Sequence, residues 1–270
     1  MAKIRRFLEL YYKFFICHRT PVIVFSMERS GSIALFHSLV SHGELVLQTH
    51  CLDPFKIKTG QVSGSARWAL RHVFNKQKNA KIISLVRDPL QSIVSHYARL
   101  NFSPRLAGRK QSAADIRDLS GEEISKIFET EFLEEKHFRH HLEWFDCEFK
   151  EPLGVDVFQY PFNKKEGYVR IRKEPYDILI LRTEMANSEK SQHVSEFLGL
   201  EGFQMQKKNM ARGADPGTPG EQSPYSEMYK ILKSQLVIPD KYLDEIVDSK
   251  HVTHFFTQDS IEAMKQQFKS

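Results

Sequence analysis

A short turn between an apolar run and an amphipathic stretch carries the first residues that could do chemistry. The turn SMERSGS (26–32) follows the apolar run VIVF, and the helical pattern SIALFHSLV begins within it. Backbone N–H groups and the positive end of a helix dipole meet at such a turn and attract phosphate or sulfate. Gly31 allows close backbone approach, while Ser30 and Ser32 add hydroxyl donors. Arg29 adds a permanent positive charge, so the turn predicts an anion-binding site.

The same turn lacks the Gly-Lys-Ser/Thr run with which nucleotide triphosphatases hold both phosphates and magnesium. Arginine and serines stand where that run would be. We therefore expect a loop that holds an anion without a required metal. A purely structural connection between a strand and a helix remains the alternative.

A second strand-to-helix junction lies in KIISLVRDPLQSIVSHYARL (81–100). Asp88 is a good N-cap, and Pro89 suits the first helical position. The helical spacing predicts a packing stripe and, beside it, a polar face; the stripe is Ile93, Tyr97 and Leu100, and the face is Ser92, Ser95, His96 and Arg99. Arg87 at the strand end and Ser95 in the helix could together grip one phosphate.

The two motifs together resemble the sulfotransferase family, whose members use 3′-phosphoadenosine 5′-phosphosulfate (PAPS) as donor. The order, the spacing and the predicted context of both motifs agree with that family. The resemblance implies that the first loop holds the 5′-phosphosulfate, through Arg29, Ser30, Gly31 and Ser32. It implies that Arg87 and Ser95 hold the 3′-phosphate. Ile33 departs from the family pattern, which often has a further Ser or Thr there.

A later basic segment resembles the part of sulfotransferases that closes over the 3′-phosphate. It contains Lys207, Lys208 and the pair Arg212-Gly213. The resemblance adds Arg212 to the expected cofactor-binding residues. A basic loop without that role is the alternative.

His50 is the candidate general base. It lies in LVLQTHCLDP, just after the second predicted strand and 21 residues after Arg29, so it should face the same crevice. Histidine side chains exchange protons near neutral pH, and sulfuryl transfer needs a base for the acceptor hydroxyl. Arg29 would stabilise the leaving phosphate. A structural histidine at a strand end is the alternative, and Asp53 and His72 are the fallback bases, although a solvent-facing role is expected for His72.

Longer stretches resemble a bacterial group of capsular polysaccharide synthesis proteins with sulfotransferase-like organisation. These stretches are DVFQYPFNKKEGY, YDILILRTE and YLDEIVDSKHVTHFFTQDSIEAM. The resemblance implies a glycan, or a related hydroxyl compound, as the acceptor.

The elements that must position these residues follow an α/β pattern. Apolar runs at 22–26, 45–49, 81–86 and 178–182 predict buried strands that alternate with helices. We expect a P-loop NTPase-like parallel sheet flanked by helices. VDVFQY and GYVRIR predict a hairpin. The other expectations are a helical insertion over 101–150, a loop over 207–224, a helical C-terminus and a single domain over 1–270.

Composition narrows the classes of function. The chain has 270 residues, a net charge of +5 and three cysteines without CxxC spacing, which argues against a disulfide framework or a zinc site. No stretch approaches the roughly 18–20 apolar residues of a membrane span, so we expect a cytoplasmic protein. A basic helix over 1–20 could contact a membrane or pack on the domain edge. Dispersed basic residues argue against nucleic-acid binding.

A histidine-rich helical segment gives a weaker signal. Glu134, His137 and His141 are spaced as helical neighbours, but they form one cluster without a second, so we predict no metal site. Arg139, His140 and Trp144 could border an acceptor cleft, or form a solvated face around a core tryptophan.

The sequence therefore predicts a PAPS-dependent sulfotransferase that acts on a hydroxyl, with a glycan as acceptor and no metal requirement. Two alternatives stay open. One is a nucleotide-dependent kinase with an altered loop, which would need a magnesium-holding Ser or Thr and an acidic partner. The other is a non-catalytic protein of the same fold that binds a nucleotide or a glycan.

Overall fold

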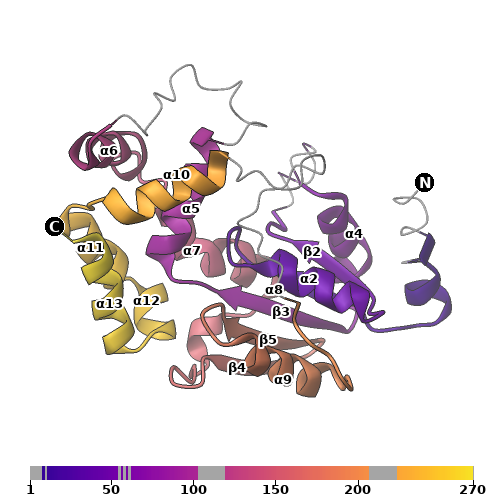
Figure 1. Ribbon diagram of the computed structural model, residues 1–270. Helices are drawn as coiled ribbons and strands as arrows, with labels where there is room; N and C mark the ends of the chain where they lie inside the picture. Colours follow the sequence, from indigo (N-terminus) through magenta and orange to yellow (C-terminus); the bar gives the residue numbers. More distant parts are fainter. Residues whose placement is uncertain are drawn as a thin grey trace. The chain divides into compact units, whose positions relative to one another are not determined.

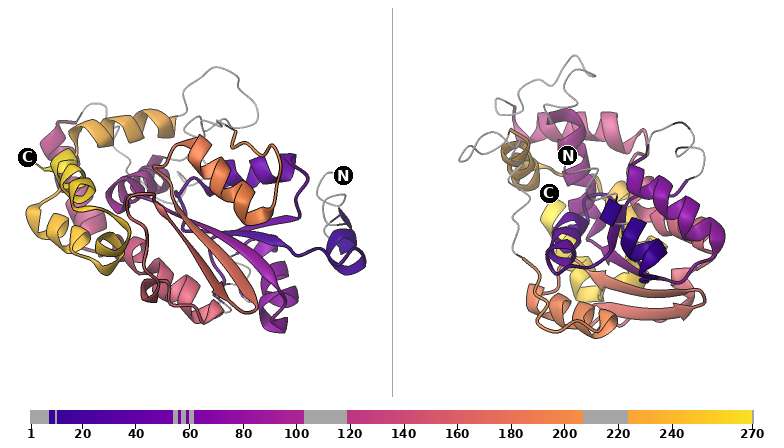
Figure 2. Two further views of the ribbon diagram at one scale, coloured as in Figure 1. Left: turned by 90° about the horizontal axis from the view of Figure 1, so that it is seen from below. Right: turned by 90° about the vertical axis from the view of Figure 1, so that its right-hand side faces the viewer.

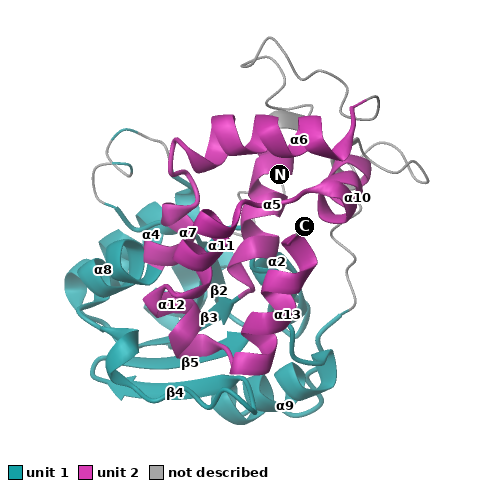
Figure 3. Ribbon diagram, turned by 90° about the vertical axis from the view of Figure 1, so that its left-hand side faces the viewer, with its two compact units in different colours: residues 1–86, 145–207 teal, residues 87–144, 208–270 magenta. Residues whose placement is uncertain are grey.

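The structure is a computed structural model that describes residues 8–9, 11–53, 56, 59, 62–102, 119–206 and 224–269 (Figure 1). The chain divides into two compact units, and each is built from two separate stretches (Figure 3). Unit 1 comprises residues 1–86 and 145–207, and unit 2 comprises residues 87–144 and 208–270. The single domain predicted over 1–270 stays a prediction.

Unit 1 contains a five-stranded sheet with the strand order β2-β1-β3-β5-β4. Four strands run parallel: β1 (Val22–Phe25), β2 (Val46–Thr49), β3 (Ala80–Val86) and β5 (Tyr176–Arg182). The edge strand β4 (Tyr168–Lys173) runs antiparallel to β5. The α/β fold class and all four predicted strands are confirmed.

The predicted hairpin has a different partner. Residues of VDVFQY form a short 3₁₀ turn, η7 (Val157–Gln159), and GYVRIR pairs instead with the strand that follows it. Asp156 explains the turn, because its carboxylate accepts the backbone N–H of Phe158 at 3.2 Å and starts a helical rather than an extended path.

Helices cover both faces of this sheet. On one face, α2 (Ser32–Ser41) and α9 (Asn187–Leu198) close a core made of Val22, Val24, Leu35, Phe36, Leu39, Val46, Ile83, Leu85, Leu179, Leu181, Met185, Val194, Phe197 and Phe203. Figure 2 shows α9 beside the long β4–β5 pair. On the other face, Phe25 stacks on Phe149 of η6 (Phe145–Lys150) with ring centroids 5.5 Å apart. Because both faces are buried, the central strands β1 and β3 are apolar without alternation.

The remaining elements of unit 1 are short or lie at its edge. They are η1 (Tyr12–Ile16), α4 (Gly64–His72), η2 (Phe74–Lys76) and α8 (Glu151–Leu153). No helix within the described ranges is long and apolar enough to cross a membrane.

The N-terminal segment packs against α4 through aromatic rings. Phe14 and Phe15 lie 4.8 Å and 6.4 Å from the ring of Trp68, whereas the side chains of Tyr12 and Ile16 are exposed. The described part therefore shows the edge-packed helix. The basic residues Lys3, Arg5 and Arg6 lie outside the described residues, and membrane contact stays a prediction.

Unit 2 is helical in all its described parts. The predicted helical insertion appears as α6 (Gly121–Phe128), η5 (Glu129–Leu133) and α7 (Arg139–Trp144), which follow α5 (Pro89–Phe102). The predicted helical C-terminus forms four helices: α10 (Pro224–Gln235), α11 (Asp240–Val247), α12 (Lys250–Phe255) and α13 (Gln258–Phe268).

The predicted faces of α5 require a correction. Ser92 and Ser95 are 0% and 1% exposed, whereas Leu100 is 41% exposed. The polar serines are thus interior, and Leu100 leaves the packing stripe. A buried partner explains the inversion for Ser92, whose hydroxyl lies 3.1 Å from Nδ1 of His141.

Buried histidines line the interior of unit 2. His141 is 1% exposed, and its ring lies 5.1 Å from that of His96. His251 in α12 is 2% exposed. Burial, with the nearby charge of His96, lowers the pKa of His141 well below its ordinary value. Burial, reinforced by His254, lowers the pKa of His251 to about 4, so both rings are neutral in the folded protein at neutral pH.

These histidines predict a loss of stability in mild acid. In the unfolded chain His251 takes up a proton near pH 6.5, but in the folded protein it does so only near pH 4, so stability falls as the pH drops between these values. We expect His251 alone to lower the free energy of unfolding by about 2 kcal/mol between pH 7.5 and pH 5. Urea denaturation at both pH values measures it. His251→Phe should shrink the difference, and an unchanged difference would contradict the account.

Candidate functional site

The predicted anion-binding turn lies between β1 and α2 and has an uncommon backbone conformation. Arg29 and Gly31 both adopt left-handed conformations, with φ of 66° and 82°. Glycine accepts this region readily, but for arginine it is strained, and such strain concentrates at functional sites. Gly31 is also the N-cap of α2, so the turn leads directly into the first N–H groups of the helix.

The two serines of the turn play different parts. The buried Ser30 hydroxyl donates to the carbonyl of Met27 at 2.7 Å, and the Ser30 carbonyl accepts from Oγ1 of Thr183 at 2.7 Å. Ser32 Oγ accepts from Nε2 of Gln48 at 3.1 Å. The hydroxyl of Ser30 therefore holds the turn itself, whereas the hydroxyl of Ser32, which is only 2% exposed, accepts from Gln48 and keeps its own hydrogen for a further acceptor.

Ser26 connects the turn to the neighbouring strands. Its hydroxyl oxygen accepts the backbone N–H of Leu85 in β3 at 2.8 Å. Its own N–H donates to the carbonyl of Thr49 in β2 at 3.4 Å. Its carbonyl accepts from Nδ1 of His50 at 2.6 Å. One buried residue thus fixes the ends of β1, β2 and β3 to one another.

The bond to Ser26 sets the state of the His50 ring. A carbonyl oxygen can only accept, so Nδ1 of His50 must carry a hydrogen. In the neutral ring the lone pair is then on Nε2, which is the nitrogen that can take a proton. His50 is half-buried at the end of β2. The structure therefore places the candidate base next to the residue that begins the anion-binding turn.

The two fallback bases are placed differently. Asp53 lies 3.9 Å from the ammonium of Lys56, and its side chain is 36% exposed. His72 is partly buried, with ring centroids 5.3 Å from Phe15 and 5.0 Å from Trp68. Burial lowers the pKa of His72. The solvent-facing position expected for His72 is thus wrong, because the N-terminal aromatic residues cover it.

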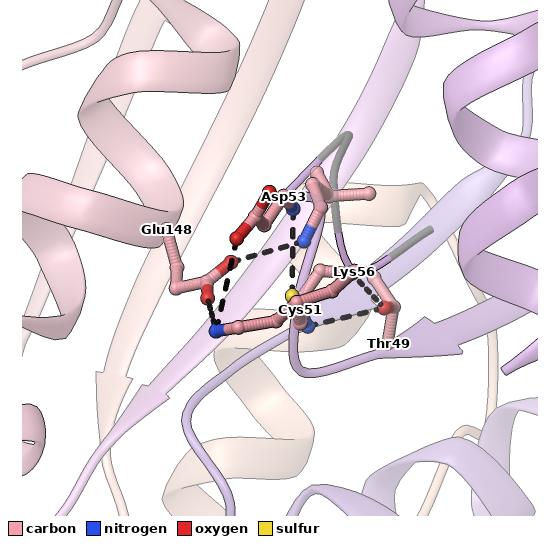
Figure 4. A network of polar contacts seen from close by, with 6 residues as sticks. Thr49, Cys51, Asp53, Lys56 and Glu148 are labelled. Carbon is pink, nitrogen blue, oxygen red and sulfur yellow. Dashed lines mark hydrogen bonds and ion pairs between the residues drawn. The ribbon is translucent and has the colours of Figure 1, made fainter. Parts of the chain in front are cut away.

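Unit 1 contains a buried acid, Glu148, that the sequence motifs do not indicate. Glu148 in η6 is 4% exposed, and its carboxylate accepts from the backbone N–H of Leu52 and from Lys56, both at 3.1 Å (Figure 4). Burial, opposed by the Asp53 N–H and reinforced by Glu148, raises the pKa of Cys51 to about 11. The available signal was the position of Glu148 between Phe145 and Phe149 on the apolar side of a helical pattern.

The second motif belongs to unit 2. Asp88 caps α5, since its Oδ1 accepts the N–H groups of Leu90 and Gln91 at 2.9 Å and 3.2 Å. Arg87 is half-buried and donates from Nη2 to the hydroxyl of Tyr229 at 3.1 Å. The segment with Lys207, Lys208 and Arg212 lies outside the described residues.

The histidine-rich segment contains both core residues and surface residues. Trp144 is 1% exposed and is a core residue. Arg139 pairs with Glu245 at 3.0 Å. Among the residues that the structure describes, no group of three or more His, Cys, Asp or Glu side chains is arranged to hold a metal ion.

The hydroxyl of Ser26 should be measurable as a contribution to stability. Ser26→Ala leaves the buried N–H of Leu85 without its acceptor and should lower the free energy of unfolding by about 1–3 kcal/mol. The matched control is Ser84→Ala in β3, which is equally buried and whose hydroxyl has no hydrogen-bond partner within the described ranges. The control should change stability little. Equal losses in both variants, measured by urea denaturation, would contradict the role of Ser26.

Comparison with known proteins identifies a family. A family model described as "Putative capsular polysaccharide synthesis protein" (NKWYS) matches residues 123–257, half of the 270-residue chain. The match includes Glu148, whereas Arg29, His50, Arg87 and Ser95 precede it. No curated protein and no solved structure matches the chain. This chain belongs to the NKWYS family of capsular polysaccharide synthesis proteins.

Proposed function

We propose that the protein transfers a sulfuryl group from PAPS to a hydroxyl of a glycan during capsular polysaccharide synthesis. Family membership supports the glycan-related role. The two sequence motifs support the donor. The observation that carries the proposal is the 2.6 Å bond between His50 and Ser26, which joins the candidate base to the start of the anion-binding turn.

The residues of the turn fit the 5′-phosphosulfate of PAPS. Arg29 supplies a permanent charge, Ser32 supplies an O–H donor, and the left-handed Gly31 brings backbone N–H groups to the start of α2. When bound, PAPS would supply an activated sulfuryl group and leave as adenosine 3′,5′-bisphosphate. The resemblance assigns the 3′-phosphate to Arg87 and Ser95. Ser95 is 1% exposed, so Arg87 is the stronger member of that pair.

Different residues of this protein have different roles in the proposed reaction. Nε2 of His50 takes the proton of the acceptor hydroxyl as the new oxygen–sulfur bond forms. The carbonyl of Ser26 continues to accept the hydrogen bond from Nδ1–H and stabilises the imidazolium that results. Arg29 places positive charge where negative charge develops on the leaving oxygen. The reaction therefore needs a base and an anion clamp from the protein.

The alternatives predict different ligands. A kinase would use a Gly-Lys-Ser/Thr run to hold magnesium, but the turn has no lysine: Arg29 is followed by Ser30, whose hydroxyl donates to the carbonyl of Met27. A non-catalytic protein of this fold would bind the donor without turnover. The composition of the turn favours sulfuryl transfer over the kinase.

Removal of either arginine should weaken binding of the reaction product. Arg29→Ala and Arg87→Ala each remove a charged donor and should weaken binding of adenosine 3′,5′-bisphosphate by about 10- to 100-fold. Isothermal titration calorimetry measures the dissociation constants. Arg71→Ala, which removes an exposed arginine of α4, is the control for the loss of one positive charge and should leave the affinity within about twofold. Unchanged affinity in both site variants would refute the assignment.

His50 should matter for turnover and not for donor binding. His50→Ala removes the base, so we expect the affinity for adenosine 3′,5′-bisphosphate to stay within about threefold while sulfuryl transfer falls by about 100-fold or more. The assay uses PAPS labelled with ³⁵S and a panel of bacterial capsular polysaccharides. If the variant transfers label as fast as the wild type, the base lies elsewhere.

A further inference from the structure

Glu148 is a buried carboxylate that the proposed chemistry does not use. Its side chain is only 5% exposed, and an ionised carboxylate is stable at such a place only when it is paired and hydrogen-bonded. Its two oxygens have separate partners. Oε1 accepts from the ammonium of Lys56, and Oε2 accepts from the backbone N–H of Leu52, which is 96 residues away in the sequence (Figure 4).

The carboxylate holds the chain immediately after the candidate base. Leu52 lies two residues beyond His50. On the other side of His50, Oγ1 of Thr49 donates to the carbonyl of Cys51 at 2.8 Å and accepts the N–H of Cys51 at 3.3 Å. Asp53 N–H then donates to Sγ of Cys51 at 3.4 Å. The backbone that carries His50 is thus restrained before and after the ring, and Glu148 provides the long-range restraint.

The ion pair with Lys56 supports Glu148 as the acceptor for Leu52 N–H. Burial lowers the pKa of Lys56, but the hydrogen bond and the charge of Glu148 outweigh it and raise that pKa. Lys56 therefore stays charged at neutral pH and remains a charged donor to Oε1 of Glu148. Because both oxygens of Glu148 already accept hydrogen bonds, this carboxylate is a poor candidate for the base.

We propose that Glu148 is a positioning residue for the base: its hydrogen bond to Leu52 N–H fixes the exit of β2, so that His50 keeps Nδ1 on Ser26 and presents Nε2 for proton transfer. The catalytic part of this inference rests on the proposed function. The structural part concerns only the His50 ring and can be tested without any substrate.

Two double variants separate positioning from stability. Lys56→Met/Glu148→Met replaces the ion pair by apolar side chains of similar volume, an exchange that often leaves proteins as stable as before, and removes the acceptor for Leu52 N–H. Lys56→Met/Glu148→Gln removes the same charges but keeps an amide oxygen at the acceptor position. The two variants therefore differ in the hydrogen bond to Leu52.

The first measurement is the tautomer of His50, read from the ¹⁵N chemical shifts of its ring and assigned with the His50→Ala variant. We expect the Nδ1–H tautomer in the wild type and in the Gln double variant. In the Met double variant we expect a mixture with the Nε2–H tautomer. A single Nδ1–H tautomer in the Met variant would overturn the proposal.

The second measurement is sulfuryl transfer. In the Met double variant kcat should fall by about 10- to 100-fold, with KM for PAPS within about twofold, because a displaced base slows the reaction without weakening donor binding. The Gln double variant should recover most of that loss. Equal loss in both variants would show a merely structural role. If the wild type transfers no sulfuryl group, the proposed function fails, while the tautomer measurement still decides the role of Glu148.

Discussion

Ser26 is the constraint on which the candidate site depends. It is fully buried at the end of β1, and its hydroxyl, N–H and carbonyl bond to Leu85, Thr49 and His50. A buried polar group that loses its hydrogen bond is costly in a low-dielectric interior, so these three bonds restrict the local geometry. The turn that begins at Ser26 and the ring of His50 are therefore set by the same residue. The predicted anion-binding turn and the candidate base therefore depend on the same strand end.

Buried polar groups recur as matched pairs in both units. In unit 1 the carboxylate of Glu148 is balanced by the ammonium of Lys56 and by Leu52 N–H. In unit 2 the hydroxyl of Ser92 lies against His141. Removal of Lys56 costs more than the pair contributes, because the carboxylate of Glu148 stays buried without this partner. Such pairs determine which residues pack against each other, in addition to stabilising the fold.

The sequence predicts the central strands well and the long-range polar contacts poorly. Four strands are recognisable because a sheet covered on both faces needs continuous apolar runs, such as KIISLV before Arg87. The partner of β4 is not recognisable in the same way, because a capping acid, Asp156, turns an apparent strand into a 3₁₀ turn. Ser95 reads as a surface residue and Leu100 as a core residue, and the structure reverses both. The role of Glu148 cannot be predicted from the sequence, because it depends on a hydrogen bond from Leu52, which is far away in the sequence.

The chemistry of the candidate site depends on which anion the turn binds. We propose that Arg29 and Ser32 bind a sulfated nucleotide without magnesium, and family membership supports a glycan-related role. The most direct test is calorimetric titration of the intact wild-type chain with PAPS and, separately, with ATP and magnesium. We expect micromolar or tighter binding of PAPS and no detectable binding of ATP with magnesium. Preferential binding of ATP with magnesium, or no binding of PAPS, would contradict it.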